Sequence, residues 1–371
     1  MNIAMIGHKR IPSREGGIEI VVDELSSRLV KKGCTVTAYN RRGHHVSGRE
    51  FETQRLKEYK GISLKSVFTF ESSKLNAIVY SILASIRASF SSFDVVHFHA
   101  EGPASMCFLP KLFGKRVIVT IHGLDWQRSK WGGFATKFLK FGEKNAVKYA
   151  DEIIVLSENV KQYFIDTYGR ETVYIPNGIT KPEIKSDFNI NKKFGLTKNS
   201  YILFLGRIVP EKGVHYLINA YKNIETDKKL VIAGGASHTD GYFNEVKELS
   251  KGNDNIVFTD FVQGEILKEL FSNAYIYCLP SDLEGMPISL LEAMSYGNCC
   301  LISDIHECTE VCENHAVTFE KGNEQDLQAR LSYLVNNPKE VEAFKSGASD
   351  FICSKYNWDD STEKTLTLYE G

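Results

Sequence analysis

The sequence contains no uncharged apolar run of about 18 residues, and its start, MNIAMIG, is not a charged leader followed by a cleavable apolar segment. We therefore expect no membrane-spanning helix and a cytoplasmic location. The chain has eight cysteines, but none forms a Cys-x-x-Cys pair that would begin a zinc site. We interpret them as buried thiols in a reducing compartment. Low-complexity segments are absent as well.

Length and composition indicate a globular protein of two domains. With 371 residues the chain is too long for one ordinary hydrophobic core. Hydrophobic residues make up 43% and charged residues 25%, which are globular values. Proline, asparagine and glycine cluster in IPNGITKP, residues 175–182, where a linker is expected. We predict one domain over residues 1–178 and a second over residues 179–355.

The net charge of −1 hides an uneven distribution of charge along the chain. Residues 1–180 contain 26 Lys and Arg against 17 Asp and Glu, whereas residues 181–371 contain 19 against 29. The first half is therefore basic and the second half acidic. A basic half suits a polyanion or an anionic membrane surface as a neighbour, although ordinary solvated charge explains it equally well.

Short apolar runs alternate with helical stretches along the whole chain. The expected strands are residues 2–6, 35–39, 95–98, 117–121, 153–156, 201–205, 230–233, 256–258, 274–279, 299–302 and 316–319. This alternation predicts an α/β protein with parallel, doubly wound sheets. Ligands bind outside the carboxyl ends of the strands in such sheets, so the loops at those ends are the candidate site.

The most informative loop is PSDLEGMPISLLEAMSYG, residues 280–297. Its first half is a turn, and ISLLEAMSYG is expected to be a helix. Glu284 lies in the turn and Glu292 lies in the helix, a little over two helical turns further on, so both carboxylates could face one ligand. The peptide N–H groups of Gly285 to Ser289 would suit a phosphate or a sugar hydroxyl. An ordinary solvated helix with two carboxylates is the alternative.

A second loop, GRIVPEKG, follows the expected strand at residues 201–205. Arg207 and Lys212 flank a turn made by Pro210 and Gly213. Arginine binds phosphate through two parallel hydrogen bonds and lysine adds a compact charge, so the two together could neutralise a diphosphate. Two solvated surface cations are the alternative.

The first domain offers looser candidates. Gly16 and Gly17 lie in the loop between the first expected strand and a helix, where their backbone could approach a phosphate. His122 directly follows the apolar strand VIVTI. A plain turn and a structural histidine are the alternatives. His97 and His99 share a strand face, as two ligands of a metal site would. We interpret them as core or cleft histidines, because no third possible ligand lies at a sequence spacing typical of metal sites.

Together these motifs resemble the retaining glycosyltransferases of family 4. The resemblance rests on P-S-x-x-E-G-x-P-x-x-x-x-E-A-x-x-x-G at residues 280–297 and on G-R-x-x-x-E-K-G at residues 206–213. It implies the GT-B fold, in which two Rossmann-like domains face each other across a cleft and the last helix, here residues 356–371, packs back on the first domain. The opening I-P-x-x-x-G-G-I-E, residues 11–19, is similar to bacterial capsule and cell-surface polysaccharide transferases that include rhamnosyltransferases.

The resemblance also implies roles for single residues. Arg207 and Lys212 match the family's ligands for the donor diphosphate, Glu292 would bind the ribose, and Glu284 would orient the sugar. The other matching donor positions are Gly16 and Gly17 at the diphosphate, His122 at the sugar, Phe261 and Val262 at the base, and Gly285, Met286, Pro287 and Ile288 beside the sugar.

The activity expected from this resemblance is retaining transfer of a sugar from a nucleoside diphosphate sugar, of UDP or dTDP type, to a hydroxyl of a saccharide or lipid-linked saccharide. Bacterial surface polysaccharide synthesis is the expected setting. We expect no cofactor and no nucleic acid partner. We also expect no metal, because no Asp-x-Asp-like pair stands at a strand end to hold a cation and two positive side chains occupy the diphosphate motif. An epimerase or phosphorylase of the same fold, or a non-catalytic sugar-nucleotide-binding protein, remains an alternative.

Residues 74–93, KLNAIVYSILASIRASFSSF, are apolar on most faces of a helix. The stretch is too polar to span a bilayer comfortably, so it is either a buried helix or one that lies on a membrane. Basic residues precede and follow it, which suits anionic lipid head groups. The second alternative would place the protein at the inner face of the cell membrane.

Overall fold

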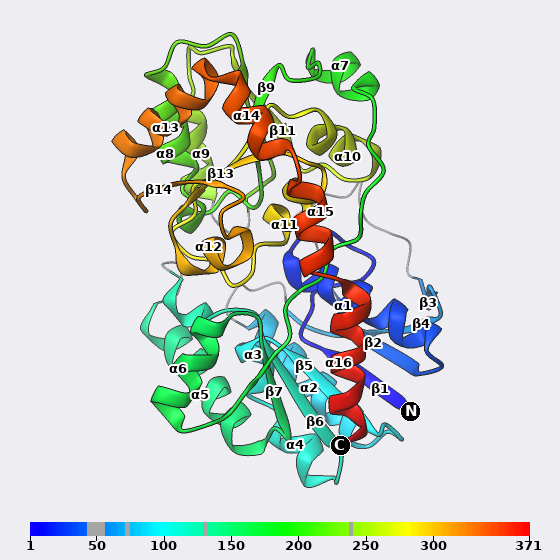
Figure 1. Cartoon of the computed structure of the whole chain (residues 1–371). Helices are drawn as coiled ribbons and strands as arrows, with labels where there is room; N and C mark the ends of the chain where they lie inside the picture. The colour runs from blue at the N-terminus through cyan, green and yellow to red at the C-terminus, as the bar shows by residue number, and fades with distance from the viewer. Residues whose placement is uncertain (43–55, 71–74, 129–131, 237–239) are drawn as a thin grey trace. The chain divides into compact units, whose positions relative to one another are not determined.

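The structure, a computed structural model, describes residues 1–42, 56–70, 75–128, 132–236 and 240–371. Within these residues the chain divides into two compact units (Figure 1). Unit 1 comprises Met1–Asn177 and Trp358–Gly371, and unit 2 comprises Gly178–Asn357. The chain therefore passes from unit 1 to unit 2 within the IPNGITKP segment and returns to unit 1 for its last helix.

The described residues of unit 1 form an eight-stranded sheet in the order β3-β4-β2-β1-β5-β6-β7-β8. Neighbouring strands are parallel except for the β3 and β4 pair. Strand β6 is buried from Val117 to Ile121, as expected of a parallel strand covered on both faces. The strands are β1 (Asn2–Ile6), β2 (Thr35–Arg41), β3 (Glu58–Tyr59), β4 (Ile62–Val67), β5 (Val95–His99), β6 (Arg116–Ile121), β7 (Glu152–Val155) and β8 (Val173–Tyr174).

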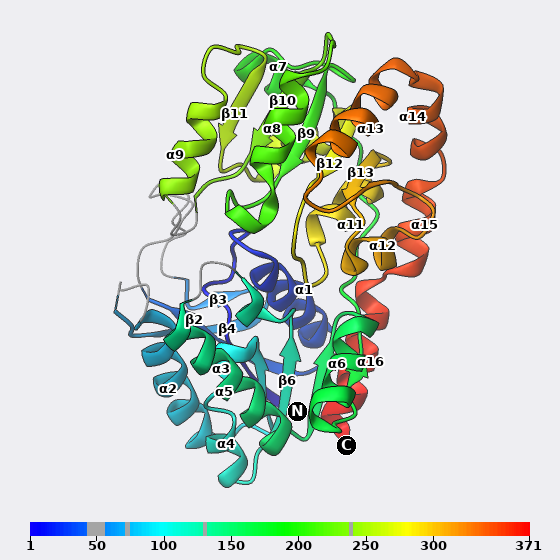
Figure 2. The ribbon, with the colours of Figure 1, turned by 90° about the vertical axis from the view of Figure 1, so that its left-hand side faces the viewer.

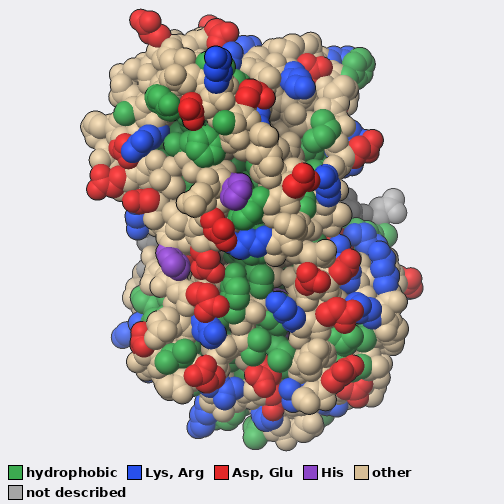
Figure 3. Space-filling model, viewed as in Figure 1, with side chains coloured by type: hydrophobic (Ala, Val, Ile, Leu, Met, Phe, Trp, Pro, Cys, Tyr) green, Lys and Arg blue, Asp and Glu red, His purple; other side chains and the backbone are tan. Residues whose placement is uncertain are grey.

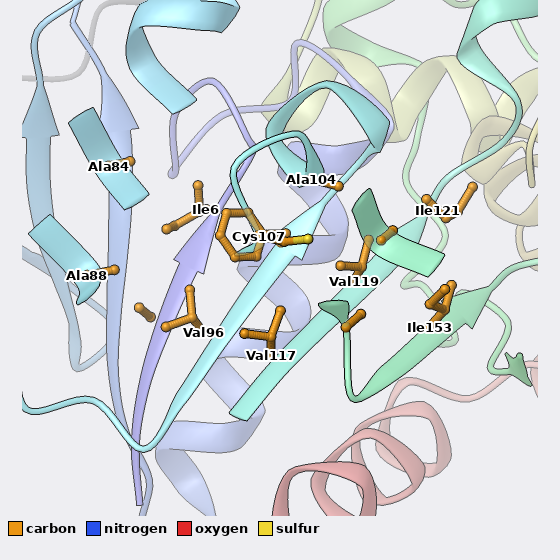
Figure 4. Close-up of a cluster of buried hydrophobic side chains, with 14 of the residues drawn as sticks. Ile6, Ala84, Ala88, Val96, Ala104, Cys107, Val117, Val119, Ile121 and Ile153 are labelled. Carbon is orange, nitrogen blue, oxygen red and sulfur yellow. The ribbon is translucent and has the colours of Figure 1, made fainter. Parts of the chain in front are cut away.

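Helices cover both faces of this sheet (Figures 1 and 2). On one face, Ala84, Ala88 and Ala104 of the helices pack against Val96 and Val119 of the strands (Figure 4). These small side chains let the helices lie close to the sheet. The helical segments of unit 1 are α1 (Gly17–Lys31), α2 (Asn76–Ser89), α3 (Glu101–Ala104), α4 (Phe108–Leu112), η2 (Asp125–Gln127), α5 (Gly133–Tyr149), α6 (Glu158–Tyr168) and α16 (Trp358–Glu370).

The last helix, α16, lies beside α1 on the other face of the unit 1 sheet. Tyr369 is buried in the core there, and its hydroxyl lies 2.6 Å from Nδ1 of His97. On the outer side, Arg28 of α1 forms an ion pair of 2.8 Å with Asp359 of α16. The C-terminal segment is therefore a structural part of unit 1.

The described part of unit 2 has a six-stranded parallel sheet in the order β11-β10-β9-β12-β13-β14. The chain builds this sheet outward from β9 in one direction, then returns to the centre and continues from β12 in the other. The strands are β9 (Tyr201–Leu205), β10 (Lys229–Ala233), β11 (Ile256–Asp260), β12 (Ile276–Leu279), β13 (Cys299–Ser303) and β14 (Val317–Phe319). This is the doubly wound order of a Rossmann sheet.

Helical segments also surround the sheet of unit 2. They are α7 (Phe188–Phe194), η3 (Pro210–Lys212), α8 (Val214–Lys222), α9 (Asp240–Leu249), α10 (Gly264–Asn273), α11 (Ile288–Ser295), α12 (His306–Cys312), α13 (Glu324–Asn336), α14 (Pro338–Lys345) and α15 (Ala348–Lys355). Two α/β units with parallel sheets confirm the predicted fold class. No helix within the described ranges is long and apolar enough to cross a membrane.

Candidate active site

The candidate site of unit 2 lies where the order of its strands reverses. Strands β9 and β12 are neighbours in the sheet but far apart in the chain. Arg207 and Lys212 follow β9, and Glu284 follows β12. In open α/β sheets, ligands bind outside the carboxyl ends of the strands, at the point where the strand order reverses. The two most specific sequence motifs therefore meet at one edge of one sheet.

Direct backbone contact holds these two loops together. Gly213, which ends the η3 turn, has a φ angle of +62°, and a Cβ atom there would lie 2.0 Å from the carbonyl oxygen of Pro280. Any larger residue would push the loops apart. The amide of Asp282 also donates a hydrogen bond of 2.9 Å to the carbonyl oxygen of Glu211. The final glycine of GRIVPEKG is thus explained by the close approach of the β12 loop.

This contact brings the side chains of Lys212 and Glu284 into a buried ion pair. Their side chains are only 11% and 7% exposed, so water screens the pair little. Ser281 donates a second hydrogen bond, of 2.6 Å, to the same carboxylate oxygen. Ser303 in turn donates a hydrogen bond of 2.5 Å to the carbonyl oxygen of Ser281. Glu284 is therefore fixed by a cation and a hydroxyl, and the sequence analysis did not assign Ser281 a role.

The amino end of α11 lies directly after Glu284. Gly285, Met286, Pro287 and Ile288 are buried, and α11 begins at Ile288. The first amides of a helix have no partner within the helix and carry partial positive charge, which favours an anion or a sugar oxygen. Glu292 lies one turn into this helix and is half-buried.

The other predicted residues of unit 2 lie at the same edge of the sheet. Phe261 is half-buried and Val262 is 9% exposed, directly after β11. Strand β10 lies between β11 and β9, and Gly234 follows it with a φ angle of +145°. A Cβ atom on Gly234 would lie 1.8 Å from the carbonyl oxygen of Gly206. The loops after three adjacent strands therefore pack together, and the sequence analysis assigned no role to Gly206 or Gly234.

In unit 1, His122 follows β6 and contacts a second histidine. Nε2 of His122 lies 3.1 Å from Nδ1 of His99, at the end of β5. Burial lowers the pKa of His122 to about 4, although Asp125 and Glu19 oppose the shift. Burial and the nearby histidines hold the pKa of His99 well below its ordinary value. Both rings are therefore neutral at pH 7, and the nitrogen that donates this hydrogen bond sets the tautomer of both.

His97 and two further groups complete this buried cluster. The rings of His97 and His99 stack with their centroids 4.2 Å apart. Nε2 of His97 lies 2.7 Å from the hydroxyl of Thr120. Burial lowers the pKa of His97 to about 3. The structure thus places His97 and His99 in the core, as expected, and identifies His99 as the residue that orients His122.

Gly16 and Gly17 lie at the amino end of α1, which follows β1. Gly16 caps the helix with an extended backbone, and a Cβ atom there would lie 2.6 Å from a carboxylate oxygen of Glu19. Glu19 accepts a hydrogen bond of 2.7 Å from the amide of Lys9. Near the start of this loop, a Cβ atom on Gly7 would lie 2.1 Å from the carbonyl oxygen of His99. The loop is thus packed against the end of β5, which carries His99.

Two buried carboxyl groups lie below the loop that carries His122. Glu143 of α5 accepts hydrogen bonds from Trp126, at 3.1 Å, and from Tyr163, at 2.8 Å. Burial raises the pKa of Glu101 to about 10, and the carboxylates of Asp125 and Glu143 add to the shift. Glu101 is therefore protonated at pH 7. Glu101 and Glu143 were not predicted from the sequence, because nothing in the local pattern distinguishes a buried carboxylate from a solvated one.

Two further observations concern a cavity in unit 1 and possible metal ligands. A cavity of about 20 Å³ lies against His97, His99 and Thr120, and it has room for about one water molecule rather than a sugar. Across the described ranges, no group of three or more His, Cys, Asp or Glu side chains is placed to hold a metal ion. Metal independence of the reaction stays a prediction from the sequence.

Comparisons with known proteins identify the chain. A model described as Glycosyltransferase Family 4 matches residues 15–181, and a model described as Glycosyl transferases group 1 matches residues 186–351. The chain is a glycosyltransferase of the family 4 type. The predicted resemblance is therefore confirmed at the level of the family. The narrower likeness to rhamnosyltransferases is not confirmed.

Two relatives of this glycosyltransferase support the same assignment, one of them over the whole chain. Alpha-maltose-1-phosphate synthase of Mycolicibacterium smegmatis is 24% identical over 400 residues, which cover 100% of this chain and 99% of the synthase. The O-antigen chain mannosyltransferase RfbU of Salmonella typhimurium is 28% identical over 209 residues, which cover 56% of this chain and 58% of RfbU. Both names describe enzymes that handle sugars, and sugar transfer is the activity that the family assigns to this chain.

Solved structures show the fold independently of close sequence similarity. The structure of Anabaena HepE in complex with UDP and glucose matches with a TM-score of 0.82 at 15% identity, covering 100% of this chain and 99% of HepE. WaaG, a glycosyltransferase of lipopolysaccharide biosynthesis, matches with a TM-score of 0.77 at 14% identity, covering 100% of each chain. The glycosyltransferase thus has the GT-B fold, as the sequence predicted.

Proposed function

We propose that this glycosyltransferase catalyses retaining transfer of a sugar from a nucleoside diphosphate sugar to a hydroxyl of a saccharide or lipid-linked saccharide. The observation that carries the proposal is the pairing of Lys212 with Glu284 at the strand reversal of unit 2, with Arg207 in the same loop as Lys212. A cation pair beside a carboxylate at such a position suits a substrate with a diphosphate at one end and a sugar at the other.

The proposed chemistry follows from the charges that develop in transfer. Cleavage of the bond between the sugar and the diphosphate places positive charge on the sugar ring and negative charge on the leaving diphosphate. Arg207, Lys212 and the amino end of α11 would stabilise the diphosphate. Lys212 is paired with Glu284. A bound diphosphate would therefore share the Lys212 ammonium, while Glu284 would turn part of its hydrogen-bonding capacity to the sugar hydroxyls.

The remaining predicted residues would hold parts of the donor that react less. Glu292 would accept hydrogen bonds from the ribose hydroxyls, and Phe261 and Val262 would pack against the base. In unit 1, His122 would contact the donor sugar, with its tautomer set by His99. Gly16 and Gly17 would offer the amino end of α1 to the diphosphate. These assignments extend the family's pattern to the matching positions of this chain.

The donor and the biological setting are narrower proposals. We propose a UDP or dTDP sugar as donor, no added cofactor and no metal, since two protein cations stand where a cation would be needed. HepE, which shares the fold, was crystallised with UDP-glucose, so uridine donors are the first to test. Synthesis of a bacterial surface polysaccharide is proposed because the relative RfbU is named for transfer to an O-antigen chain.

A thermal-shift screen over UDP, dTDP, GDP and ADP sugars tests the donor. A ligand at about 100 times its dissociation constant stabilises the folded protein by about 2.7 kcal/mol. We expect a UDP or dTDP sugar to raise the melting temperature of the wild type, and Arg207→Ala to abolish the shift. If the donor raises the melting temperature of Arg207→Ala as much as that of the wild type, the assignment of Arg207 to the diphosphate is wrong.

Product analysis then separates transfer from the alternative reactions. A transferase releases nucleoside diphosphate only together with a glycosylated acceptor. An epimerase converts the donor without an acceptor, a phosphorylase needs inorganic phosphate, and a non-catalytic binder consumes nothing. Full activity after treatment with a chelator would support metal independence, whereas loss of activity that Mg²⁺ or Mn²⁺ restores would contradict it.

A further inference from the structure

One face of unit 1 consists of α2, α4 and α5, which lie side by side over the same side of the sheet (Figure 2). The inner sides of α2 and α5 contribute Ala84, Ala88 and Ala146 to one buried core. The rings of Phe108 in α4 and Tyr149 in α5 lie 5.9 Å apart and join these two helices. The three outer sides therefore form one continuous surface, which is independent of the candidate site in unit 2.

Helix α2 differs from an ordinary surface helix, because large apolar side chains also point away from the core. Its buried side carries Ser81 and Ser85, whereas Ile82, Ile86 and Phe90 point outward at a spacing of four residues. A soluble helix normally turns such an apolar row toward the core. Phe90, just beyond the helix, is 72% exposed. Ile82, Ile86 and Phe90 are therefore the apolar side chains of the predicted stretch 74–93 that stay exposed on this side of the helix. Residue 74 itself lies outside the described residues.

The end of α4 extends this apolar surface. The ring of Phe113 packs on that of Phe90, with the centroids 4.6 Å apart. Leu112, the last residue of α4, is 71% exposed. Lys111 and Lys115 flank the two apolar side chains in the sequence. Side chains of this kind are rarely exposed together on a soluble monomer unless they contact something apolar.

Helix α5 presents a stripe in which phenylalanine and lysine alternate. Phe134, Lys137, Phe141, Lys144 and Lys148 are separated by three or four residues, so they share one side of the helix. All five are exposed, and Phe134 is 74% exposed. The single acid of this helix, Glu143, is buried on the opposite side. The outer stripe of α5 therefore carries positive charge and aromatic rings but no negative charge.

The charge of this surface differs from that of the opposite face. Residues 75–149 contain ten Lys and Arg and four Asp and Glu, and two of the four acids, Glu101 and Glu143, are buried. On the face that carries α16, acidic and basic side chains are interspersed (Figure 3). Lys32 and Glu363 form one of the ion pairs there. The segment that forms α2, α4 and α5 therefore carries an excess of positive charge.

We propose that this surface, marked by Phe90, Leu112, Phe134, Lys137, Phe141 and Lys144 and called here the basic apolar face, docks the protein on an anionic lipid bilayer. Lysines at the rim would meet lipid phosphates, while the exposed Phe, Leu and Ile side chains would enter the boundary between head groups and acyl chains. A soluble polyanion would satisfy the lysines but would leave these apolar side chains in water. The combination of both kinds of side chain therefore favours the bilayer.

The test is sedimentation of the whole protein with vesicles that contain neither donor nor acceptor, so the result does not depend on the proposed activity. Vesicles of phosphatidylcholine are compared with vesicles that also contain phosphatidylglycerol, in about 0.05 M and about 0.5 M salt. We expect the wild type to bind the anionic vesicles at low salt and to be released at high salt. Far-ultraviolet circular dichroism and the melting temperature confirm that each variant is folded.

Two double variants separate the two contributions. Lys137→Gln/Lys144→Gln should lower the partition coefficient by about 25-fold at low salt, because each basic residue near the surface contributes about 1 kcal/mol. Phe134→Ser/Phe141→Ser should lower it by about tenfold or more, because each ring loses an apolar contact. The matched control is Phe188→Ser/Lys192→Gln on α7 of unit 2, where both residues are also exposed, and it should bind like the wild type.

Four outcomes would overturn the proposal. Two of them concern the wild type: no binding to anionic vesicles at low salt, or equal binding to neutral vesicles at both salt concentrations. Normal binding by Phe134→Ser/Phe141→Ser, with loss only in the lysine variant, would assign the face to a soluble polyanion. A stable dimer of the wild type that the phenylalanine variant converts to monomer would assign the face to a second copy of the chain.

Discussion

The buried ion pair between Lys212 and Glu284 leads to a prediction about the stability of unit 2. Lys212→Met keeps most of the aliphatic length of the side chain but removes its charge. Glu284, whose side chain is 7% exposed, would then retain only the hydrogen bond from Ser281 among the two contacts described above. We therefore expect Lys212→Met to destabilise the folded protein even without substrate, although Lys212 is proposed to act on the donor.

The magnitude follows from the burial of the pair. Removal of one partner of a buried ion pair costs about 3–5 kcal/mol, because the other charge stays buried without compensation. For a domain of this size, 1 kcal/mol lowers the melting temperature by about 2–4 °C, so the expected loss is about 6–20 °C. Lys212→Met/Glu284→Gln removes both charges and should recover much of this loss.

Thermal unfolding of the wild type, both single variants and the double variant gives the coupling free energy directly. The matched control is Lys251→Met, which removes an ion pair with Glu248 whose side chains are 74% and 66% exposed. It should change the free energy of unfolding by less than about 1 kcal/mol. The reasoning is refuted if Lys212→Met melts at the wild-type temperature, or if the double variant is less stable than both single variants.

Three further predictions concern single groups. Glu292→Gln should weaken binding of the free nucleoside diphosphate, whereas Glu284→Gln should mainly lower turnover; calorimetry beside steady-state kinetics would contradict this if the two effects were exchanged. Burial lowers the pKa of His8 to about 4 and that of His97 to about 3, so the unfolded chain binds more protons below pH 6.5. Stability should therefore fall as the pH drops from about 6.5 toward 4, and urea midpoints that stay constant over this range would show that these histidines are not buried neutral. Because the pKa of Glu101 is raised to about 10, its folded-state stabilisation is lost as the pH rises from 4.5. Glu101→Gln should thus be more stable than the wild type at about pH 9, and equal or lower stability there would be the contrary result.

Much of the fold and of the motif-bearing loops could be predicted because local sequence specifies them. The apolar run Tyr201–Leu205 coincides with strand β9. At residues 280–297, local proline, serine, aspartate and glycine residues predict the turn and the end of the helix that follows it. Strands β3 and β4 were not predicted. Strand β4 exposes Lys65 and Ser66 in its second half, and β3 has only two residues, so the pairing of β4 with β2 and of β3 with β4, rather than local pattern, makes them strands.

The contacts within the site could not be predicted, because they depend on strand order. Lys212 and Glu284 are 72 residues apart in the chain, and they meet only because β9 and β12 are neighbours in the sheet. The sequence analysis gave them separate roles and did not predict that they pair. The same holds for His99 and His122, which follow adjacent strands β5 and β6. The basic apolar face was missed in α5, because the side of a helix that faces outward is set by packing.

The most direct test of the central claim is the configuration of the transferred sugar. The wild type is incubated with the donor found in the thermal-shift screen and with a saccharide acceptor, and the anomeric configuration of the new glycosidic bond is determined by nuclear magnetic resonance. The account predicts a product with the same anomeric configuration as the donor, formed with release of the nucleoside diphosphate. An inverted product, or consumption of the donor without a glycosylated acceptor, would contradict it.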